Sequence, residues 1–252
     1  MTALILDCDG VLADTERHGH LPAFNATFEH YGLPVRWSES EYREKLRIGG
    51  GKERLASLFA DGAVRVDGDR THMVAAWHRT KTEIFTDLVA AGRIPARPGV
   101  ARIMSAALTA GWTVAVASTS AEASVRAVLA RAAGYDVASR VPVFAGDVVP
   151  AKKPDPAIYA LTVERLGLDP ADTLVIEDSA IGLRAATGAG LRCLVTVNDY
   201  TRDEDFGTAA LVVSGLGDPG LPPIEVLANR SAATPGDFLT LDDVRACLGG
   251  PA

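Results

Sequence analysis

Residues 3–12 read ALILDCDGVL, and this stretch decides how the chain folds. The apolar run 3–6 has the length of a short buried strand, and Asp7 follows it directly. Asp7 and Asp9 lie two positions apart, so both side chains leave the strand end on the same side. Gly10 then lets the backbone turn without steric cost. This pattern predicts either a site for a hard cation or a pair of turn acids that only cap a helix.

Short apolar runs alternate with longer amphipathic segments along most of the chain. Most short runs are bounded by Gly, Pro or Asp, as strands are, and the longer segments have helical periodicity. Such alternation predicts an α/β fold, a doubly wound parallel sheet covered by helices on both faces. The predicted strands are 3–6, 113–117, 143–145, 174–176, 193–197 and 211–213, and the helices between them are 99–110, 121–133, 156–166 and 181–189.

The interval 15–97 carries almost no strand signal and has helical patterns instead. It predicts a helical domain inserted into an α/β core domain made of residues 1–14 and 98–252, with connections near 13–16 and 94–98. The last fifty residues are the least readable, with loops expected at 215–220, 221–223 and 232–236. The helices predicted in these two parts are 15–31, 40–46, 52–60, 72–91 and 241–248.

The composition excludes several functional classes. With 252 residues, a net charge of −7 and a pI near 5.3, the chain lacks the basic face that a nucleic-acid partner requires. No apolar stretch reaches the ~18 residues of a membrane helix, so no membrane partner is expected. Cys8, Cys193 and Cys247 are odd in number and far apart, which suits a reducing compartment better than a disulfide framework. The histidines form no zinc-type pair with a cysteine.

Three later strands are also followed by polar residues that suit phosphate chemistry. The second strand leads into residues 118–120 (Ser-Thr-Ser), which can bind an anion or simply cap a helix. The third leads to Lys152 and Lys153, which supply positive charge or remain solvated. The fourth leads into Glu177 and Asp178, an acid pair for a metal or a helix cap. Because the carboxyl ends of parallel strands meet at one edge, these groups are expected to converge there with the first acid pair.

In this order, Asp-x-Asp-Gly, Ser, Lys-Pro and Glu-Asp resemble the four motifs of the haloacid dehalogenase superfamily of phosphohydrolases. The resemblance covers essentially the whole chain and implies a Rossmann-like core with the helical insert as a C1-type cap. It is sharpest for the CbbY-like branch, which is related to beta-phosphoglucomutase. The segments that carry this closer likeness are 14–16, 19–20, 24–25, 48–54, 144–150 and 175–183, the last of which reads VIEDSAIGL.

The resemblance implies a magnesium enzyme with an acid nucleophile. Mg²⁺ would be held by Asp7, the backbone carbonyl of Asp9 and Asp178, with Glu177 acting through a water. Asp7 would attack phosphorus and become transiently phosphorylated. Asp9 would protonate the leaving sugar oxygen and then activate the water that releases phosphate.

The remaining core motifs would bind the transferred phosphoryl group. The resemblance implies that the Ser118 hydroxyl, amides around Thr119 and the ammonium of Lys153 stabilise its oxygens. Lys153 takes this role rather than Lys152 because the family's lysine directly precedes the proline, here Pro154.

The helical insert is expected to select the substrate. Lys52 and Arg54 follow three glycines that end at Gly51, so they could grip a second phosphate. A nucleotide P-loop is excluded because Glu53 stands where Ser or Thr should follow the lysine. The alternatives are ordinary surface charge for the cations and packing for His20. The full set of expected substrate-binding residues is Glu16, His20, Gly51, Lys52, Arg54, Lys81, Ser118, Thr119 and Lys153.

Members of the CbbY-like branch that resemble this chain hydrolyse xylulose-1,5-bisphosphate, a product that inhibits Rubisco. The resemblance therefore implies a sugar-phosphate phosphatase that forms xylulose-5-phosphate. A phosphomutase, a phosphatase of another sugar phosphate or of phosphoglycolate, and a catalytically silent sensor are the alternatives. We expect a monomer whose partner is a small sugar (bis)phosphate, located in the cytoplasm, or in the plastid stroma if a transit peptide has been removed.

Overall fold

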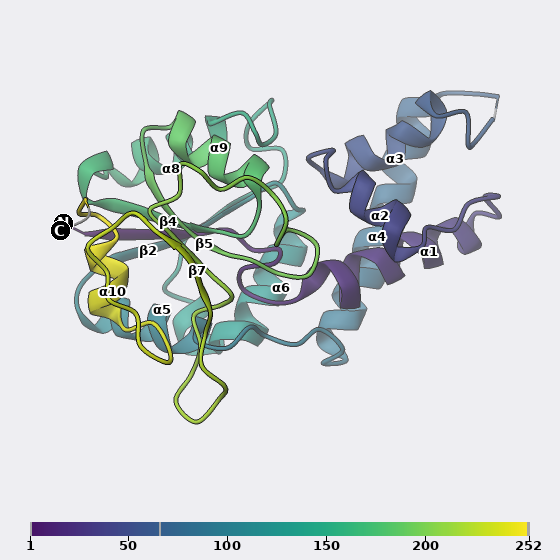
Figure 1. Cartoon of the computed structure of the whole chain (residues 1–252). Helices are drawn as coiled ribbons and strands as arrows, with labels where there is room; N and C mark the ends of the chain where they lie inside the picture. Colours follow the sequence, from purple (N-terminus) through teal and green to yellow (C-terminus); the bar gives the residue numbers. More distant parts are fainter. Residues whose placement is uncertain (1, 66, 251–252) are drawn as a thin grey trace.

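A seven-stranded sheet forms the centre of the computed structural model, which describes residues 2–65 and 67–250. The strand order is β3-β2-β1-β4-β5-β6-β7; β1 to β6 are parallel and β7 is antiparallel to β6 (Figure 1). The predicted α/β fold is confirmed. The strands are β1 (Ala3–Leu6), β2 (Thr113–Ser118), β3 (Val143–Ala145), β4 (Thr173–Glu177), β5 (Arg192–Thr196), β6 (Leu211–Val213) and β7 (Val226–Asn229).

Alternate side chains of β1 enter different hydrophobic clusters, as expected for a strand buried on both faces. Leu4 and Leu6 join the cluster formed with α5, α6 and α10, whereas Ile5 joins the cluster formed with α8 and α9. Figure 1 shows these two helical layers on opposite faces of the sheet. The helices are α5 (Val100–Thr109), α6 (Glu122–Ala133), α7 (Tyr135–Ala138), α8 (Ala157–Leu166), η2 (Pro170–Asp172), α9 (Ala180–Gly188) and α10 (Leu241–Ala246).

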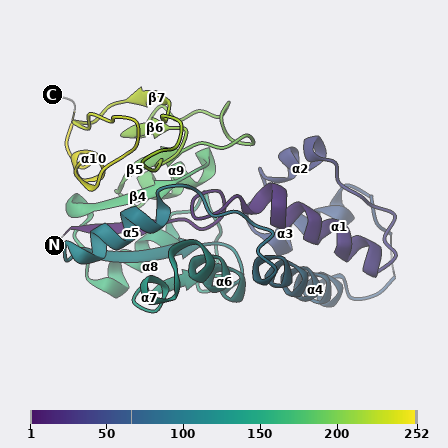
Figure 2. The same cartoon turned by 90° about the horizontal axis from the view of Figure 1, so that it is seen from below.

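Four helices form a region beyond the end of the sheet at which β1 terminates, as Figure 1 and Figure 2 show. This helical region has a hydrophobic cluster of its own, which includes Phe24, Phe28, Trp37, Tyr42 and Trp77. In the described part of the chain, no helix is both long and apolar enough to cross a membrane. The elements of the helical region are η1 (Glu16–His20, a π-helical turn), α1 (Leu21–His30), α2 (Glu39–Lys45), α3 (Gly51–Ala60) and α4 (Arg70–Ala90).

Two connections join the helical region to the sheet, and they run side by side. Ala13 pairs with Ala96 in an antiparallel bridge, and the Asp14 amide donates to the Pro95 carbonyl at 3.0 Å. The guanidinium of Arg97 donates to four backbone carbonyls at this edge of the sheet. They belong to Gly10 after β1, Thr196 at the end of β5, Val197 just beyond it, and Ser214 just beyond β6. Both connections are thereby tied to the carboxyl edge of the sheet.

Two short elements were not predicted from the sequence, and one predicted helix differs in its first turn. β7 lies between the predicted loops 221–223 and 232–236 and was not predicted, because this half-exposed edge strand has no alternating apolar pattern. The segment predicted as a single helix at 15–31 begins as the π-helical η1 and becomes regular only at Leu21. The four residues of α7 are too few to show helical periodicity in the sequence.

Candidate active site

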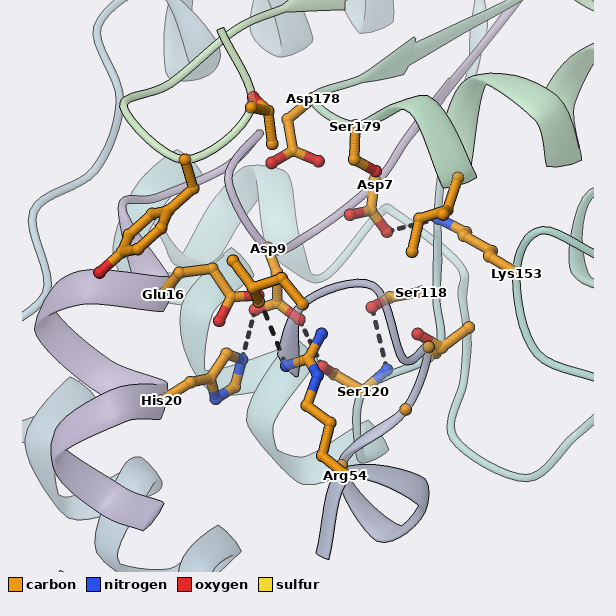
Figure 3. Close-up of a pocket in the computed structure, with 18 of the residues that line it drawn as sticks. Asp7, Asp9, Glu16, His20, Arg54, Ser118, Ser120, Lys153, Asp178 and Ser179 are labelled. Carbon is orange, nitrogen blue, oxygen red and sulfur yellow. Dashed lines mark hydrogen bonds and ion pairs between the residues drawn. The ribbon is translucent and has the colours of Figure 1, made fainter. Parts of the chain in front are cut away.

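Three carboxyl groups converge between the ends of β1 and β4. Asp7, Glu177 and Asp178 are all buried, and one carboxylate oxygen of each lies within 4.8 Å of the others. Figure 3 shows Asp7 and Asp178 pointing into the same space. Carboxylate oxygens are the ligands that Mg²⁺ prefers, so these residues fit the expected metal. The prediction of an acid cluster that can hold a metal ion is confirmed.

Lys153 is buried among these acids. Its Nζ donates to Asp7 Oδ1 and to Glu177 Oε1, both at 2.7 Å, and to the Tyr159 hydroxyl at 2.9 Å. Tyr159 in turn donates to Glu177 Oε1 at 2.5 Å. Burial acts to lower the pKa of Lys153, but the charges of Asp7 and Glu177 outweigh it and hold that pKa above its usual value. Lys153 is therefore a permanent cation at this site.

One lysine does not balance three acids. Burial raises the pKa of Asp7 to about 7, with Glu177 and Asp9 adding to the effect and Lys153 opposing it. Burial, together with Glu177 and Asp7, also raises the pKa of Asp178. Raised carboxyl pKa values report an excess of negative charge in a region of low dielectric. A divalent cation would relieve that excess.

Asp9 points away from this cluster, toward the helical region. Its Oδ1 lies 2.8 Å from His20 Nε2, and its Oδ2 accepts from the Ser120 hydroxyl (Figure 3). Burial acts to raise the pKa of Asp9, but His20 and these hydrogen bonds outweigh it and hold the pKa well below its ordinary value. Lys81 Nζ lies 2.6 Å from His20 Nδ1. Because an ammonium only donates, Nδ1 accepts, and the histidine proton that bonds Asp9 is on Nε2.

Glu16 and Arg54 approach the same space from the helical region. The Tyr42 hydroxyl donates to Glu16, and Arg54 Nη1 lies 3.1 Å from the Tyr42 oxygen and 3.8 Å from Glu16 Oε1. Burial lowers the pKa of Lys81 to about 8, although Asp9 and Glu16 oppose this effect. Two cations of the helical region, the buried Lys81 and the partly buried Arg54, thus line this side of the site.

A cavity of about 500 Å³ lies between the sheet edge and the helical region. Lys52 does not line it: its Nζ pairs with Asp147 beside a neighbouring cavity of about 610 Å³. Glu177 lies behind the cavity wall and contacts it through Lys153. The predicted residues that line the cavity are Asp7, Asp9, Glu16, His20, Gly51, Arg54, Lys81, Ser118, Thr119, Lys153 and Asp178.

Several residues that contact this site were not predicted from the sequence, or were predicted in another role. Asn198 directly follows the predicted strand 193–197, so the rule that ligands bind at the carboxyl edge could have indicated it. Ser120 was predicted, with Ser118 and Thr119, to bind an anion or cap a helix, whereas its hydroxyl bonds Asp9. Tyr42 and Tyr159 carry no sequence signal, because each reaches the site only through tertiary packing.

Comparison with known proteins identifies the family of this site. The haloacid dehalogenase-like hydrolase family matches residues 1–190, which is three quarters of the chain. The chain belongs to this family. The resemblance stated from the motifs and the enzyme class, a phosphatase, are both confirmed.

Relatives of this haloacid dehalogenase-like hydrolase are similar to it over most of their own length. A CBBY-like protein of Arabidopsis thaliana is 48% identical over 223 residues, covering 86% of this chain and 70% of the relative. The CbbY protein of Cereibacter sphaeroides is 41% identical over 220 residues, covering 86% and 94%. The crystal structure of a mutant CbbY from Rhodobacter sphaeroides in complex with xylulose-(1,5)bisphosphate has a TM-score of 0.79 at 40% identity, covering 87% and 97%. The likeness thus extends beyond the catalytic motifs.

The raised pKa of Asp7 predicts how the stability of the metal-free protein depends on pH. The folded state binds the Asp7 proton more tightly than the unfolded chain, with a pKa of about 7 against 3.8. The Asp7 contribution to the free energy of unfolding therefore falls as the pH rises from 3.8 to about 7. We expect Asp7→Asn to gain stability relative to wild type across that interval, by on the order of 1–4 kcal/mol.

Calorimetric melting in EDTA at several pH values measures this difference. Asp136→Asn, which changes an exposed acid of α7, is the control and should follow wild type. If the melting temperatures of wild type and Asp7→Asn changed in parallel with pH, the charge excess assigned to the acid cluster would be contradicted.

Proposed function

We propose that this phosphatase removes one phosphate from xylulose-1,5-bisphosphate and forms xylulose-5-phosphate. The observation that carries the proposal is the distribution of cations around the cavity. Lys153 lies beside Asp7 at one side, and Arg54 and Lys81 enter from the helical region at the other. Two separate cationic groups suit a substrate with two phosphates, of which only one lies next to the nucleophile. The xylulose-(1,5)bisphosphate complex of the CbbY relative supports the choice of sugar.

In the proposed reaction, Asp7 attacks phosphorus and forms an aspartyl-phosphate. Mg²⁺, held by Asp7, the Asp9 carbonyl and Asp178 with Glu177 close by, would neutralise charge on the phosphoryl group. Lys153 keeps Asp7 oriented through their 2.7 Å contact and offers positive charge to the phosphoryl oxygens. Such fixed charges act mainly by positioning and by stabilising the loose transition state.

Asp9 serves as the acid and then as the base. Its low pKa keeps Asp9 ionised in the free protein, so it must first take up a proton when substrate binds. It then gives that proton to the leaving sugar oxygen, and afterwards accepts one from the water that attacks the aspartyl-phosphate. His20 and Ser120 hold its two oxygens from opposite sides, so the carboxyl group is oriented before substrate binds. Because His20 belongs to the helical region, that orientation depends on the position of η1 against the core.

Residues 15–97 are proposed to act as a cap over a core made of residues 1–14 and 98–252. The cap supplies Glu16, Arg54 and Lys81 to the cavity. Arg54, held by Tyr42 and the Ile48 carbonyl, is the proposed contact of the second phosphate. Ser118 and Thr119, at the opposite wall, are proposed to bind the transferred phosphoryl group.

Replacing the nucleophile should stop turnover without unfolding the protein. We expect Asp7→Asn to release phosphate from xylulose-1,5-bisphosphate at under about 1% of the wild-type rate, since the amide is a poor nucleophile. Phosphate release with Mg²⁺ is the measurement, circular dichroism checks folding, and Asp136→Asn is the control. Retention of more than a few per cent of the rate would contradict the assignment of Asp7.

The second-phosphate contact predicts a selective loss. We expect Arg54→Ala to lower kcat/KM for xylulose-1,5-bisphosphate by about 10- to 100-fold, the effect of losing a charged hydrogen bond. Hydrolysis of p-nitrophenyl phosphate, which has one phosphate, should change far less. Lys45→Ala removes a cation of the same region that pairs with Asp61 outside the cavity, and it serves as the control.

Lys52→Ala belongs in the same experiment. A loss of kcat/KM for the bisphosphate alone would show that Lys52 contacts the second phosphate, as expected from the sequence. Equal loss on both substrates in Arg54→Ala would contradict a second-phosphate contact. A substrate panel with ribulose-1,5-bisphosphate, β-glucose-1-phosphate and phosphoglycolate then tests the choice of sugar, including the phosphomutase alternative.

A further inference from the structure

The turn that follows β5, residues 198–201, connects the core to the interior of the helical region. Tyr200 belongs to the core by sequence, yet it is only 6% exposed and packs in the hydrophobic cluster of the helical region. Its ring lies perpendicular to that of Tyr42, with 6.2 Å between centroids. The 198–201 turn therefore inserts a core side chain between the helices.

Two arginines of the helical region hold this turn. Arg43 on α2 donates to the Asp199 carbonyl at 2.7 Å and to the Tyr200 carbonyl at 3.1 Å, and its guanidinium lies 5.3 Å from the Tyr200 ring. Arg17 on η1 donates to the Asp199 carboxylate at 2.8 Å, with its guanidinium 5.7 Å from the same ring. The position of the turn therefore depends on the position of η1 and α2.

The other end of the turn contacts the acid cluster. Asn198 Nδ2 donates to Asp178 Oδ2 at 2.7 Å, and Asn198 Oδ1 accepts from the Tyr200 amide at 2.8 Å. Since an amide N–H can only donate, its partner is the oxygen of the Asn198 carboxamide, and the NH₂ group must face Asp178. The Tyr200 backbone thus sets which group of Asn198 meets Asp178.

We propose that the 198–201 turn couples the position of the helical region against the core to the metal affinity of the acid cluster. Tyr200 fixes the turn in the helical region, and Asn198 positions Asp178. This inference rests on the proposed function, in which Asp178 is a metal ligand. The Asn198 bond occupies Asp178 Oδ2 and restrains the orientation of the carboxylate, whose other oxygen, Oδ1, would then be the ligand atom. Residues that orient a metal ligand commonly contribute 10- to 100-fold to affinity.

Magnesium binding without substrate tests the coupling. We expect calorimetric titration of the full chain with Mg²⁺ to show binding weakened about 10-fold or more in Asn198→Ala. Arg43→Ala, at an exposed position that contacts only the turn and not the acids, should weaken it about 3- to 10-fold. Asp147→Asn is the matched control. It removes the charge that pairs with Lys52 of the helical region and with Lys152 of the core, away from the turn, and should leave Mg²⁺ affinity unchanged.

Coupling between two sites is reciprocal, so Mg²⁺ binding must also stabilise the contact of the helical region with the 198–201 turn. Hydrogen exchange of residues 39–45 should slow on adding Mg²⁺ to wild type and to Asp147→Asn, but not to Asn198→Ala. Wild-type affinity in Arg43→Ala, or an equal loss in Asp147→Asn, would overturn the coupling and leave the proposed function intact. Failure of wild type to bind Mg²⁺ would contradict the proposed function itself.

Discussion

The contact of Lys153 with Asp7 and Glu177 is the interaction on which the site depends. Three acids from adjacent strands converge because their strands end at one edge, and burial makes their shared charge costly. Lys153 offsets part of that cost through two bonds of 2.7 Å. The negative charge that is left is what makes the position a candidate binding site for a cation.

The close approach of this cluster requires a glycine at one position. Gly10 has a φ of +74°, and a Cβ there would lie 2.0 Å from Asp178 Oδ2. The turn after β1 can therefore pass directly against the acid that follows β4. Gly10 thus lies against Asp178 while the neighbouring Asp9 side chain turns toward His20. One backbone turn therefore contacts the acid cluster of the core and the helical region at successive residues.

The helical region contributes more than a cover for the cavity. Lys81, His20 and Asp9 form a chain of contacts of 2.6 Å and 2.8 Å that crosses from α4 to the core. Arg43 and Tyr200 form a second crossing on α2. In the first crossing Lys81 reaches Asp9 through one residue, His20, and in the second Arg43 bonds directly to the turn that holds Asp178 through Asn198. Both crossings link the position of the helical region to that of the acids.

The sequence by itself determined the sheet, its helical insert and the core acids, because strand ends in a parallel sheet share an edge and local patterns reveal where strands end. Asp7 and Asp178 could be predicted in this way, whereas the choice of Lys153 over Lys152 came from the family resemblance. Only the tertiary structure decided which cations of the insert face the cavity: Arg54 does, whereas Lys52, two residues earlier, pairs with Asp147. It also decided the roles of Tyr159, Asn198 and Tyr200. Tyr159 bonds Glu177, 18 residues away in the chain, and Asn198 bonds Asp178, 20 residues away. Tyr200 packs among helices from a distant part of the chain. No local pattern records contacts of that kind, since they arise when separately folded segments pack against each other.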